Sequence, residues 1–148
     1  MSKNITWKQL DEMSAHELYE VLKLRSEVFV VEQRCAYLDP DGEDVSAFHA
    51  QFLIDGVLVG YLRVLPPNVN SRFVRLGRVV FSQKARGQSL GLKLMQSAID
   101  FIMTKFEGVS IKLSAQVALQ KYYASLGFKV CSAPYDDEGI MHIDMELV

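Results

Sequence analysis

The segment from Arg78 to Phe101 places the strongest constraint on how this chain of 148 residues folds. It reads RVVFSQKARGQSLGLKLMQSAIDF, in which β-branched and aromatic residues typical of a strand precede a basic turn and a stretch with apolar residues at helical spacing. A strand that leads into a helix predicts a β-α-β crossover in the middle of the fold. The first N–H groups of such a helix lack partners within it and carry partial positive charge, so the turn is a candidate anion site.

The turn in this segment is rich in small and basic residues. Lys84 adds a charge before it, and the turn itself comprises Arg86, Gly87, Gln88, Ser89, Leu90 and Gly91. It lacks both the Gly-Lys-Ser/Thr of a P-loop and the three-glycine fingerprint of dinucleotide-binding folds. We therefore expect it to bind a phosphate or pyrophosphate. The alternative is a tight structural turn with a solvated basic flank.

The remaining chain predicts a single domain over residues 1–148. Ser14 and Glu17 form a capping box that predicts the start of a helix, Asp55-Gly56 predicts a hairpin turn, and Gly127 predicts the end of a short helix. The resulting order is β-α-β-β-β-α-β-α-β-β, with strands at residues 5–10, 48–54, 57–65, 73–81, 109–115, 128–135 and 140–148. This order predicts an α+β fold with a mixed sheet.

Composition and charge exclude several classes of function. The net charge of -2 argues against nucleic acid as the main partner, and no apolar run approaches the roughly 20 residues that a membrane span requires. The polar N-terminal sequence does not resemble a signal peptide. Cys35 and Cys131 show no metal-ligand spacing and are expected to be reduced thiols. We therefore expect a cytoplasmic protein with no metal site and no membrane partner.

The sequence VVFSQKARGQSLG resembles motif A of the GNAT acyltransferases, in which Gln or Arg is followed at the third position by Gly and at the fifth by Gly or Ala. Arg86, Ser89 and Gly91 occupy these positions, and Ser89 stands where glycine is usual. The sequence YYASLGF resembles the helix-end signature of the family, whose tyrosine is Tyr123 by its spacing from Gly127. The segments LRSEVFVVEQ, LSAQ and GIMHIDM together resemble the ElaA-like branch.

The resemblance implies the GNAT fold, a mostly antiparallel mixed sheet flanked by helices, with acetyl-CoA as co-substrate. Residues 86–91 would hold its pyrophosphate, and Gln116 stands where the family often has an asparagine that contacts coenzyme A. The pantetheine arm would lie along the strand residues Val79, Val80 and Phe81. We expect the Ser89 hydroxyl to cap the following helix or to bond a phosphate oxygen, and the substitution to weaken coenzyme A binding.

The resemblance also assigns catalytic roles. Tyr123 would be the general acid for the leaving thiolate, and packing on the sheet is its alternative role. Glu32 would orient or deprotonate an amine together with Arg25, unless the two form a structural ion pair. His49 and His142 are weaker candidates for the acceptor site, since a lone histidine among apolar neighbours is more often a core residue. The acidic residues Asp39, Asp41, Glu43 and Asp44 are expected to form a solvated loop near the acceptor entrance.

Together these features and the resemblance predict an N-acetyltransferase that transfers an acetyl group to an amine of a small molecule or peptide. We expect direct transfer in a ternary complex rather than through a covalent intermediate, because neither cysteine occupies a motif position. An acyl-homoserine-lactone-synthase-like enzyme is one alternative, since LRSEVFVVEQ and YLRVLPP look like that group. A non-catalytic acyl-CoA-binding or sensing domain is the other, given the departures at Ser89 and Gln116. The sequence is compatible with a monomer or a homodimer.

Overall fold

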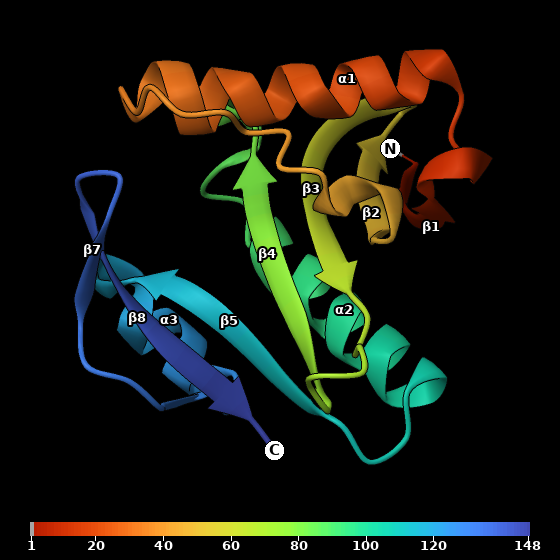
Figure 1. Cartoon of the computed structure of the whole chain (residues 1–148). Helices are drawn as coiled ribbons and strands as arrows, with labels where there is room; N and C mark the ends of the chain where they lie inside the picture. Colours follow the sequence, from red (N-terminus) through yellow and green to blue (C-terminus); the bar gives the residue numbers. More distant parts are fainter. Residues whose placement is uncertain (1) are drawn as a thin grey trace.

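Eight strands form one sheet in the computed structural model, which describes residues 2–148 (Figure 1). They are β1 (Lys3–Gln9), β2 (Phe48–Ile54), β3 (Val57–Leu65), β4 (Phe73–Phe81), β5 (Ser110–Gln116), β6 (Lys129–Val130), β7 (Tyr135–Asp137) and β8 (Ile140–Leu147). The order is β1-β2-β3-β4-β5-β8-β6, and β7 pairs with β8. Only β4 and β5 are parallel. The predicted mixed α+β fold is confirmed.

Three α-helices accompany the sheet: α1 (Ala15–Arg25), α2 (Leu90–Lys105) and α3 (Gln120–Ser125). A π-helical segment, Ser26–Glu32, continues α1. The predicted capping box is confirmed, because the Ser14 hydroxyl accepts from the Glu17 N–H and the Glu17 carboxylate accepts from the Ser14 N–H. Single 3-10 turns lie at Leu10–Glu12, Glu43–Val45, Gln83–Ala85 and Val117–Leu119.

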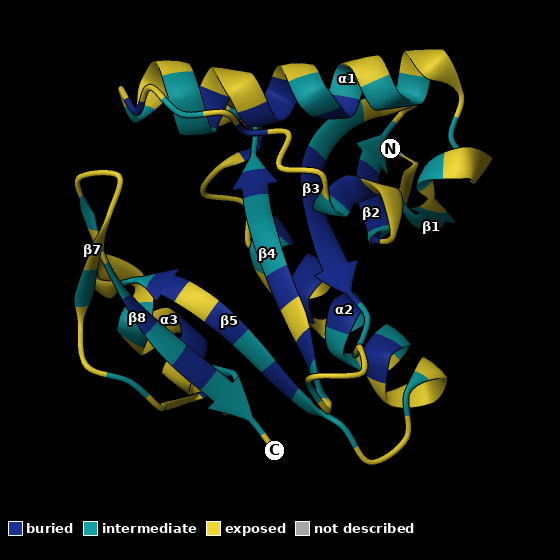
Figure 2. Cartoon of the chain, viewed as in Figure 1, coloured by how far each residue is buried: buried dark blue, intermediate teal, exposed yellow. Residues whose placement is uncertain are grey.

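The helices cover the two faces of the sheet unequally. On one face, α2 and α3 pack over a large core to which β3 contributes Leu62 and Val64. On the other face, α1 packs on a smaller cluster that contains Tyr61 of β3 and Val80 of β4. This alternation follows from the period of two along a strand. Figure 2 shows the result as buried residues concentrated along β2 and β3.

The sheet splits between β4 and β5. The two strands pair at three positions, Phe73 with Ser110, Val74 with Ile111 and Arg75 with Lys112, and then diverge (Figure 1). Beyond this point, β4 contains a bulge: its register with β3 shifts between Tyr61 and Arg63, and Arg78 has a left-handed φ of 54°. A bulge bends a strand and increases its twist. The carboxyl ends of β4 and β5 are therefore held apart.

The C-terminal region differs from the sequence prediction. Residues 128–135 were expected to form one strand, but the structure has two short strands, β6 and β7, separated by an irregular segment. Pro134 lies in that segment and has no N–H to donate to a ladder, which explains the interruption. The short helix predicted to end at Gly127 is α3, which follows directly on the 3-10 turn Val117–Leu119.

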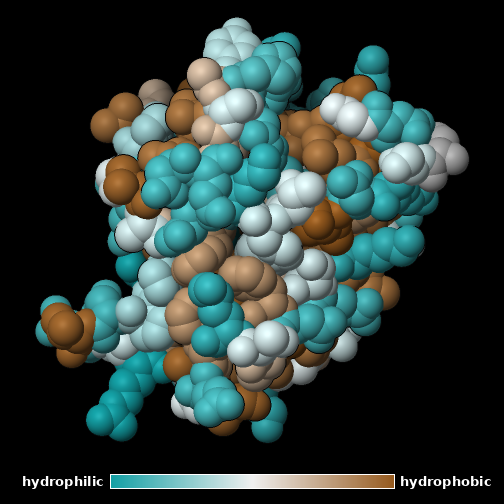
Figure 3. Space-filling model, turned by 90° about the vertical axis from the view of Figure 1, so that its right-hand side faces the viewer, coloured by the Kyte–Doolittle hydropathy of each residue, from teal (hydrophilic) through white to brown (hydrophobic). Residues whose placement is uncertain are grey.

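On the side shown in Figure 3, hydrophilic side chains separate patches of hydrophobic ones. Trp7 of β1 stacks on Phe101 of α2 with ring centroids 4.0 Å apart, and the Lys105 Nζ lies 4.9 Å from the ring centroid of Phe48. Within residues 2–148, none of the helices combines the length and the apolar character needed to cross a membrane.

Candidate active site

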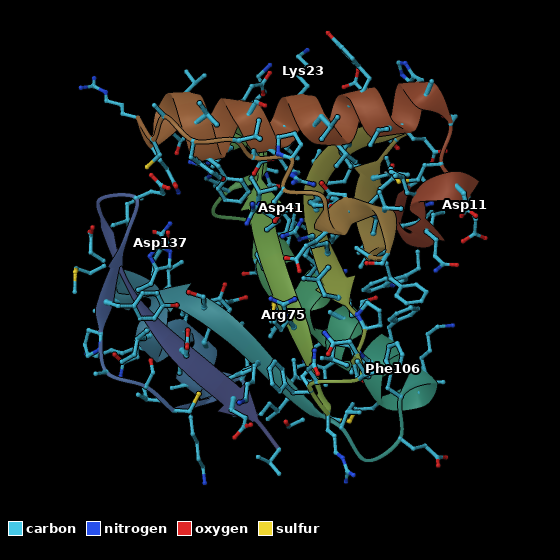
Figure 4. The ribbon with its side chains drawn as sticks, viewed as in Figure 1. Asp11, Lys23, Asp41, Arg75, Phe106 and Asp137 are labelled. Atoms are coloured by element: carbon cyan, nitrogen blue, oxygen red, sulfur yellow. The ribbon has the colours of Figure 1, made fainter. Side chains whose placement is uncertain are left out.

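The split between β4 and β5 opens into a cavity of about 410 Å³. Both strands line it: β4 through Leu76, Gly77, Arg78 and Val79, and β5 through Leu113, Ser114 and Gln116. The segment that follows α1 and the β7–β8 hairpin supply the other walls. Asp41 lies in the first of these walls and Asp137 in the second, and Figure 4 shows them on either side of the gap.

The cavity reaches both faces of the sheet. Successive residues of β5 point to opposite faces. Leu113 belongs to the core beneath α2 and α3. Ser114 and Gln116, one and three positions further along β5, therefore lie on the opposite face. His142 of β8 pairs with Gln116 across the strands and therefore shares its face. Tyr123 reaches the same cavity from α3, on the other side of the sheet.

The turn before α2 has the backbone of an anion-binding loop. Gly87 and Ser89 both have left-handed conformations, with φ of 77° and 58°. Within residues 2–148, neither a backbone carbonyl nor a side chain accepts a hydrogen bond from the N–H groups of Gly87, Gln88 or Ser89. Consecutive amides of this kind form a concave site for an anion. The turn that the sequence singles out therefore has a backbone suited to an anion.

Ser89 does not cap α2 as expected, because its hydroxyl makes no capping hydrogen bond. Its conformation explains why glycine is usual at this position. A side chain in the left-handed region costs about 1–2 kcal/mol relative to the right-handed one, and glycine avoids that cost. The departure at Ser89 is therefore a strained backbone rather than a new cap.

Gly91, the next glycine of the turn, lies under the side chain of Tyr122. A Cβ at Gly91 would lie 3.1 Å from the Tyr122 hydroxyl oxygen. Tyr122 therefore reaches from α3 to the start of α2, while its neighbour Tyr123 lines the cavity. The two tyrosines have different environments, as their adjacent positions on a helix predict.

Tyr123 is well placed to face a ligand in the cavity. It lines the cavity although only 7% of its surface is exposed. Its ring packs edge-on against Phe128, with centroids 6.2 Å apart. Burial raises the pKa of Tyr123 to about 12. The hydroxyl is therefore protonated throughout the neutral range and can donate a hydrogen bond.

Arg86 and Glu32 form an ion pair beside the turn. The Arg86 guanidinium donates to both carboxylate oxygens of Glu32, at 2.7 and 3.1 Å, and also to the Phe81 carbonyl. The hydrogen bond from Arg86 holds the pKa of Glu32 below its usual value. Glu32 does not line the cavity. Its position next to Arg86 fits the coenzyme A loop better than the expected acceptor pocket.

The expected Arg25–Glu32 ion pair is wrong. The side chain of Arg25 is fully buried, and its guanidinium donates to Asp39 at 2.7 Å and to Asp44 at 2.8 Å. Arg25 does not line the cavity. An acceptor-binding role does not fit this position, whereas a structural role in fixing the segment after α1 does.

The acidic segment is only in part the solvated loop that the sequence predicts, because Asp41 is exposed but two of the other acidic residues are not. Asp39 and Asp44 are buried, with 3% and 9% of their surfaces exposed. Arg25 pairs with both, Arg78 donates to Asp39 at 2.8 Å, and Arg63 donates to Asp44 at 3.0 Å. These arginines come from α1, β4 and β3, so only the tertiary fold brings them to the loop.

The two candidate histidines are in different environments. His49 is fully buried, and its ring nitrogens contact the Tyr61 hydroxyl at 2.5 Å and the Asp44 carbonyl at 2.8 Å. Burial lowers the pKa of His49. It is a core residue and does not line the cavity, so the expected acceptor-binding role does not fit it. His142 does line the cavity.

Several lining residues escaped the sequence reasoning. Tyr37, Arg78 and Asp137 are examples. The Arg78 guanidinium lies 5.7 Å from the centroid of the Tyr37 ring, and the Tyr37 hydroxyl donates to Asp39 at 2.9 Å. An arginine in an otherwise apolar strand was the available signal for Arg78. Among residues 2–148, no cluster of three or more His, Cys, Asp or Glu side chains could hold a metal ion.

Comparison with known proteins agrees with this geometry. The GNAT acetyltransferase domain family matches residues 11–148. ElaA of Escherichia coli is 37% identical over 145 residues, 95% of each chain, and its crystal structure superposes with a TM-score of 0.92 over 99% of this chain and 100% of that one. An acyl-CoA N-acyltransferase from Pseudomonas aeruginosa is 40% identical, with a TM-score of 0.95 over 99% of this chain and 100% of that one.

A more distant structure shows the same fold. An aminoglycoside 6'-N-acetyltransferase complexed with coenzyme A superposes with a TM-score of 0.71 over 95% of both chains, at 15% identity. The sequence match, the split sheet and the open amides before α2 agree in pointing to one family. The chain belongs to the GNAT acetyltransferases, and it has the family and the fold of an acyl-CoA N-acyltransferase.

Proposed function

We propose that this single domain, residues 1–148, is a cytoplasmic N-acetyltransferase that acts as a monomer or homodimer. It transfers the acetyl group of acetyl-CoA to an amine of a small molecule or peptide. The observation that carries the proposal is the cavity at the β4–β5 split, which Tyr123 enters from one face of the sheet and polar side chains enter from the other. Such a passage lets a donor and an acceptor approach one point from opposite sides, as direct transfer requires.

The donor side has a set of groups suited to coenzyme A. The edge of β4 has no strand partner on the β5 side after Arg75, so the backbone of Val79, Val80 and Phe81 can pair with an extended pantetheine arm. The amides of residues 87–91 and the Arg86 side chain would hold the pyrophosphate. Gln116, which lines the cavity, is the further candidate contact.

The chemistry assigned to these residues is acyl transfer. Acetyl-CoA would supply the acetyl group as a thioester. A backbone N–H on the free edge of β4 would polarise the thioester carbonyl, a contribution of about 3 kcal/mol in other enzymes. Tyr123 would donate a hydrogen bond to the sulfur. Because the pKa of Tyr123 is near 12, complete proton transfer from its hydroxyl to a free thiolate is uphill by about 5 kcal/mol. Tyr123 would therefore stabilise the leaving sulfur by donating a hydrogen bond rather than by full proton transfer.

Thermal stability against ligands is the first test. We would measure melting with acetyl-CoA, free coenzyme A, longer acyl-CoAs and NAD, since binding at a hundredfold excess over Kd stabilises by about 2.7 kcal/mol. Shifts with coenzyme A species alone would support the donor. Thiol release from acetyl-CoA would then be followed with amino acids, polyamines, aminoglycosides and peptides.

The alternatives predict other results. A binding or sensing domain would give melting shifts without thiol release, and an acyl-homoserine-lactone-synthase-like enzyme would prefer longer or carrier-bound acyl donors. Absence of any shift would overturn the proposal for coenzyme A.

A further inference from the structure

His142 occupies the acceptor side of the cavity with one ring nitrogen engaged. The residue is half-buried on β8, between Gln116 of β5 and Tyr135 of β7, its partners across the strands. Its Nδ1 lies 2.8 Å from the carbonyl oxygen of Ile140. Its ring stacks on that of Tyr135, with centroids 6.2 Å apart and planes inclined by 25°. The ring orientation is therefore fixed by two contacts.

The contact at Nδ1 fixes the tautomer. A backbone carbonyl can only accept a hydrogen bond, so Nδ1 must carry the proton. A neutral imidazole has one N–H, and Nε2 consequently holds a lone pair. Within residues 2–148, no protein group makes a hydrogen bond with Nε2. The arrangement presents a proton acceptor to a cavity whose opposite wall contains Tyr123, a proton donor.

We propose that Nε2 of His142 is the general base that takes the proton from the attacking amine. The inference rests on the acyl transfer proposed above and adds the residue that this proposal lacks. Among the other histidines and the predicted base, both ring nitrogens of His49 have partners in the core, His16 is exposed on α1, and Glu32 is paired with Arg86 outside the cavity.

The surroundings of His142 include charges from several elements. Asp137 and Glu138 of the hairpin line the same cavity, and Asp41 and Arg78 lie in the wall across from it. Asp41 is itself paired with Arg63 at 2.6 Å. On the strand side, the Tyr135 hydroxyl bonds Asp144 and Ser114. These groups set the electrostatic field around Nε2.

The proposed step balances in atoms and protons. The amine nitrogen attacks the thioester carbonyl carbon, so that a C–N bond forms and the C–S bond breaks with its electron pair on sulfur. One N–H proton moves to Nε2 of His142, and the leaving thiolate accepts a hydrogen bond from Tyr123. The imidazolium then releases its proton to solvent and the thiolate takes one from solvent, leaving an amide and a thiol.

The decisive variant is His142→Asn, whose amide can still donate to the Ile140 carbonyl but has no equivalent of Nε2. His16→Asn is the matched control, because it removes an exposed imidazole far from the cavity. Thiol release from acetyl-CoA would be measured from acidic to alkaline pH, with the most active amine of the panel or with water as acceptor. We expect kcat to fall about 100-fold or more, with the KM for acetyl-CoA unchanged. A kcat in His142→Asn as high as that of the His16→Asn control would overturn the proposal.

A second measurement does not depend on turnover. Long-range proton–nitrogen NMR spectra of the protein labelled with ¹⁵N-histidine distinguish the two neutral tautomers. We expect the signal that is lost in His142→Asn to be that of an Nδ1–H tautomer, and an Nε2–H tautomer would overturn the proposal. If the native protein binds no coenzyme A and releases no thiol, the acyltransferase function itself fails, a result distinct from a defect confined to His142→Asn.

Discussion

Glu32 and Arg86 are 54 positions apart in the chain, and the guanidinium of Arg86 donates two hydrogen bonds to the carboxylate of Glu32, at 2.7 and 3.1 Å. Glu32 ends the π-helical segment that continues α1, and Arg86 begins the turn that leads to α2. Phe29 of the same π-helical segment lines the cavity. The pair therefore connects a wall of the cavity to the proposed pyrophosphate loop.

This pair gives a prediction about coenzyme A affinity. Glu32 is an anion that competes with the pyrophosphate for Arg86, so we expect Glu32→Gln to tighten coenzyme A binding a few-fold and Arg86→Gln to weaken it. Isothermal titration at low and high salt would measure both, with the exposed Glu27→Gln as control. Weaker binding in Glu32→Gln would instead mean that Glu32 positions Arg86 for the ligand.

Ser89→Gly is expected to stabilise the protein. The φ of 58° is strained for serine but not for glycine, so we expect a gain of up to about 1 kcal/mol in the free energy of unfolding and coenzyme A binding at least as tight. Gly87→Ala is the opposite change at a φ of 77° and should cost about 1 kcal/mol. Urea unfolding and titration calorimetry would check both. Weaker binding in Ser89→Gly would show that the hydroxyl contacts a phosphate.

Features set by neighbouring residues could be predicted from the sequence. The capping box of Ser14 and Glu17 involves residues three positions apart, and the hairpin at Asp55-Gly56 depends on the turn alone. The strand, turn and helix around motif A are equally local. These features, with the family signatures, were sufficient for the α+β fold and for the strand, turn and helix that carry the proposed anion loop.

Features set by tertiary contacts could not be predicted in the same way. The bulge at Arg78 depends on the register between β3 and β4, and the neighbouring Gly77 does not by itself place it. The helical spacing of Arg25 and Glu32 suggested one ion pair, whereas the fold gives each a partner from a distant segment. Pairing by periodicity alone fails when a loop of opposite charge folds back onto the helix.

Arg25→Met tests the structural role of the buried network. It would leave Asp39 and Asp44 without their shared partner in a buried environment. Removing one member of a buried ion pair typically costs about 3–5 kcal/mol, and we expect a loss of that size in urea unfolding. Arg72→Met, at an exposed position, is the control. A loss no larger than the control's would mean that the aspartates are neutralised by other groups.

Glu17→Gln gives a prediction with a defined pH dependence. The hydrogen bond from the Ser14 N–H, followed by that from Lys8, lowers the pKa of Glu17 from 4.5 to about 2. A carboxylate with a depressed folded-state pKa stabilises the fold above its unfolded pKa, and this contribution is lost as the pH falls from about 4.5 towards 2. We expect Glu17→Gln to destabilise the protein by about 1 kcal/mol at neutral pH.

The matching experiment is urea unfolding of native protein, Glu17→Gln and the control Glu20→Gln at neutral pH, at pH about 5 and at pH about 3.5. The difference between native and Glu17→Gln should shrink only at the lowest pH. A difference that is independent of pH would mean that the hydrogen-bond geometry of the cap, and not the charge of Glu17, carries the stability.

Tyr123→Phe separates catalysis from binding. The change removes only the hydroxyl of a residue that lines the cavity, and leaves the ring against Phe128. We expect kcat for thiol release to fall about tenfold to a hundredfold, with an unchanged Kd for coenzyme A. Tyr122→Phe is the matched control, because the Tyr122 hydroxyl lies over Gly91 at the loop and any effect should appear in coenzyme A affinity instead.

Since burial raises the pKa of Tyr123 to about 12, the alkaline side of the native pH profile should not reflect its ionisation below pH about 10. An unchanged kcat in Tyr123→Phe would remove Tyr123 from the reaction and leave the leaving thiolate to water or to a backbone donor.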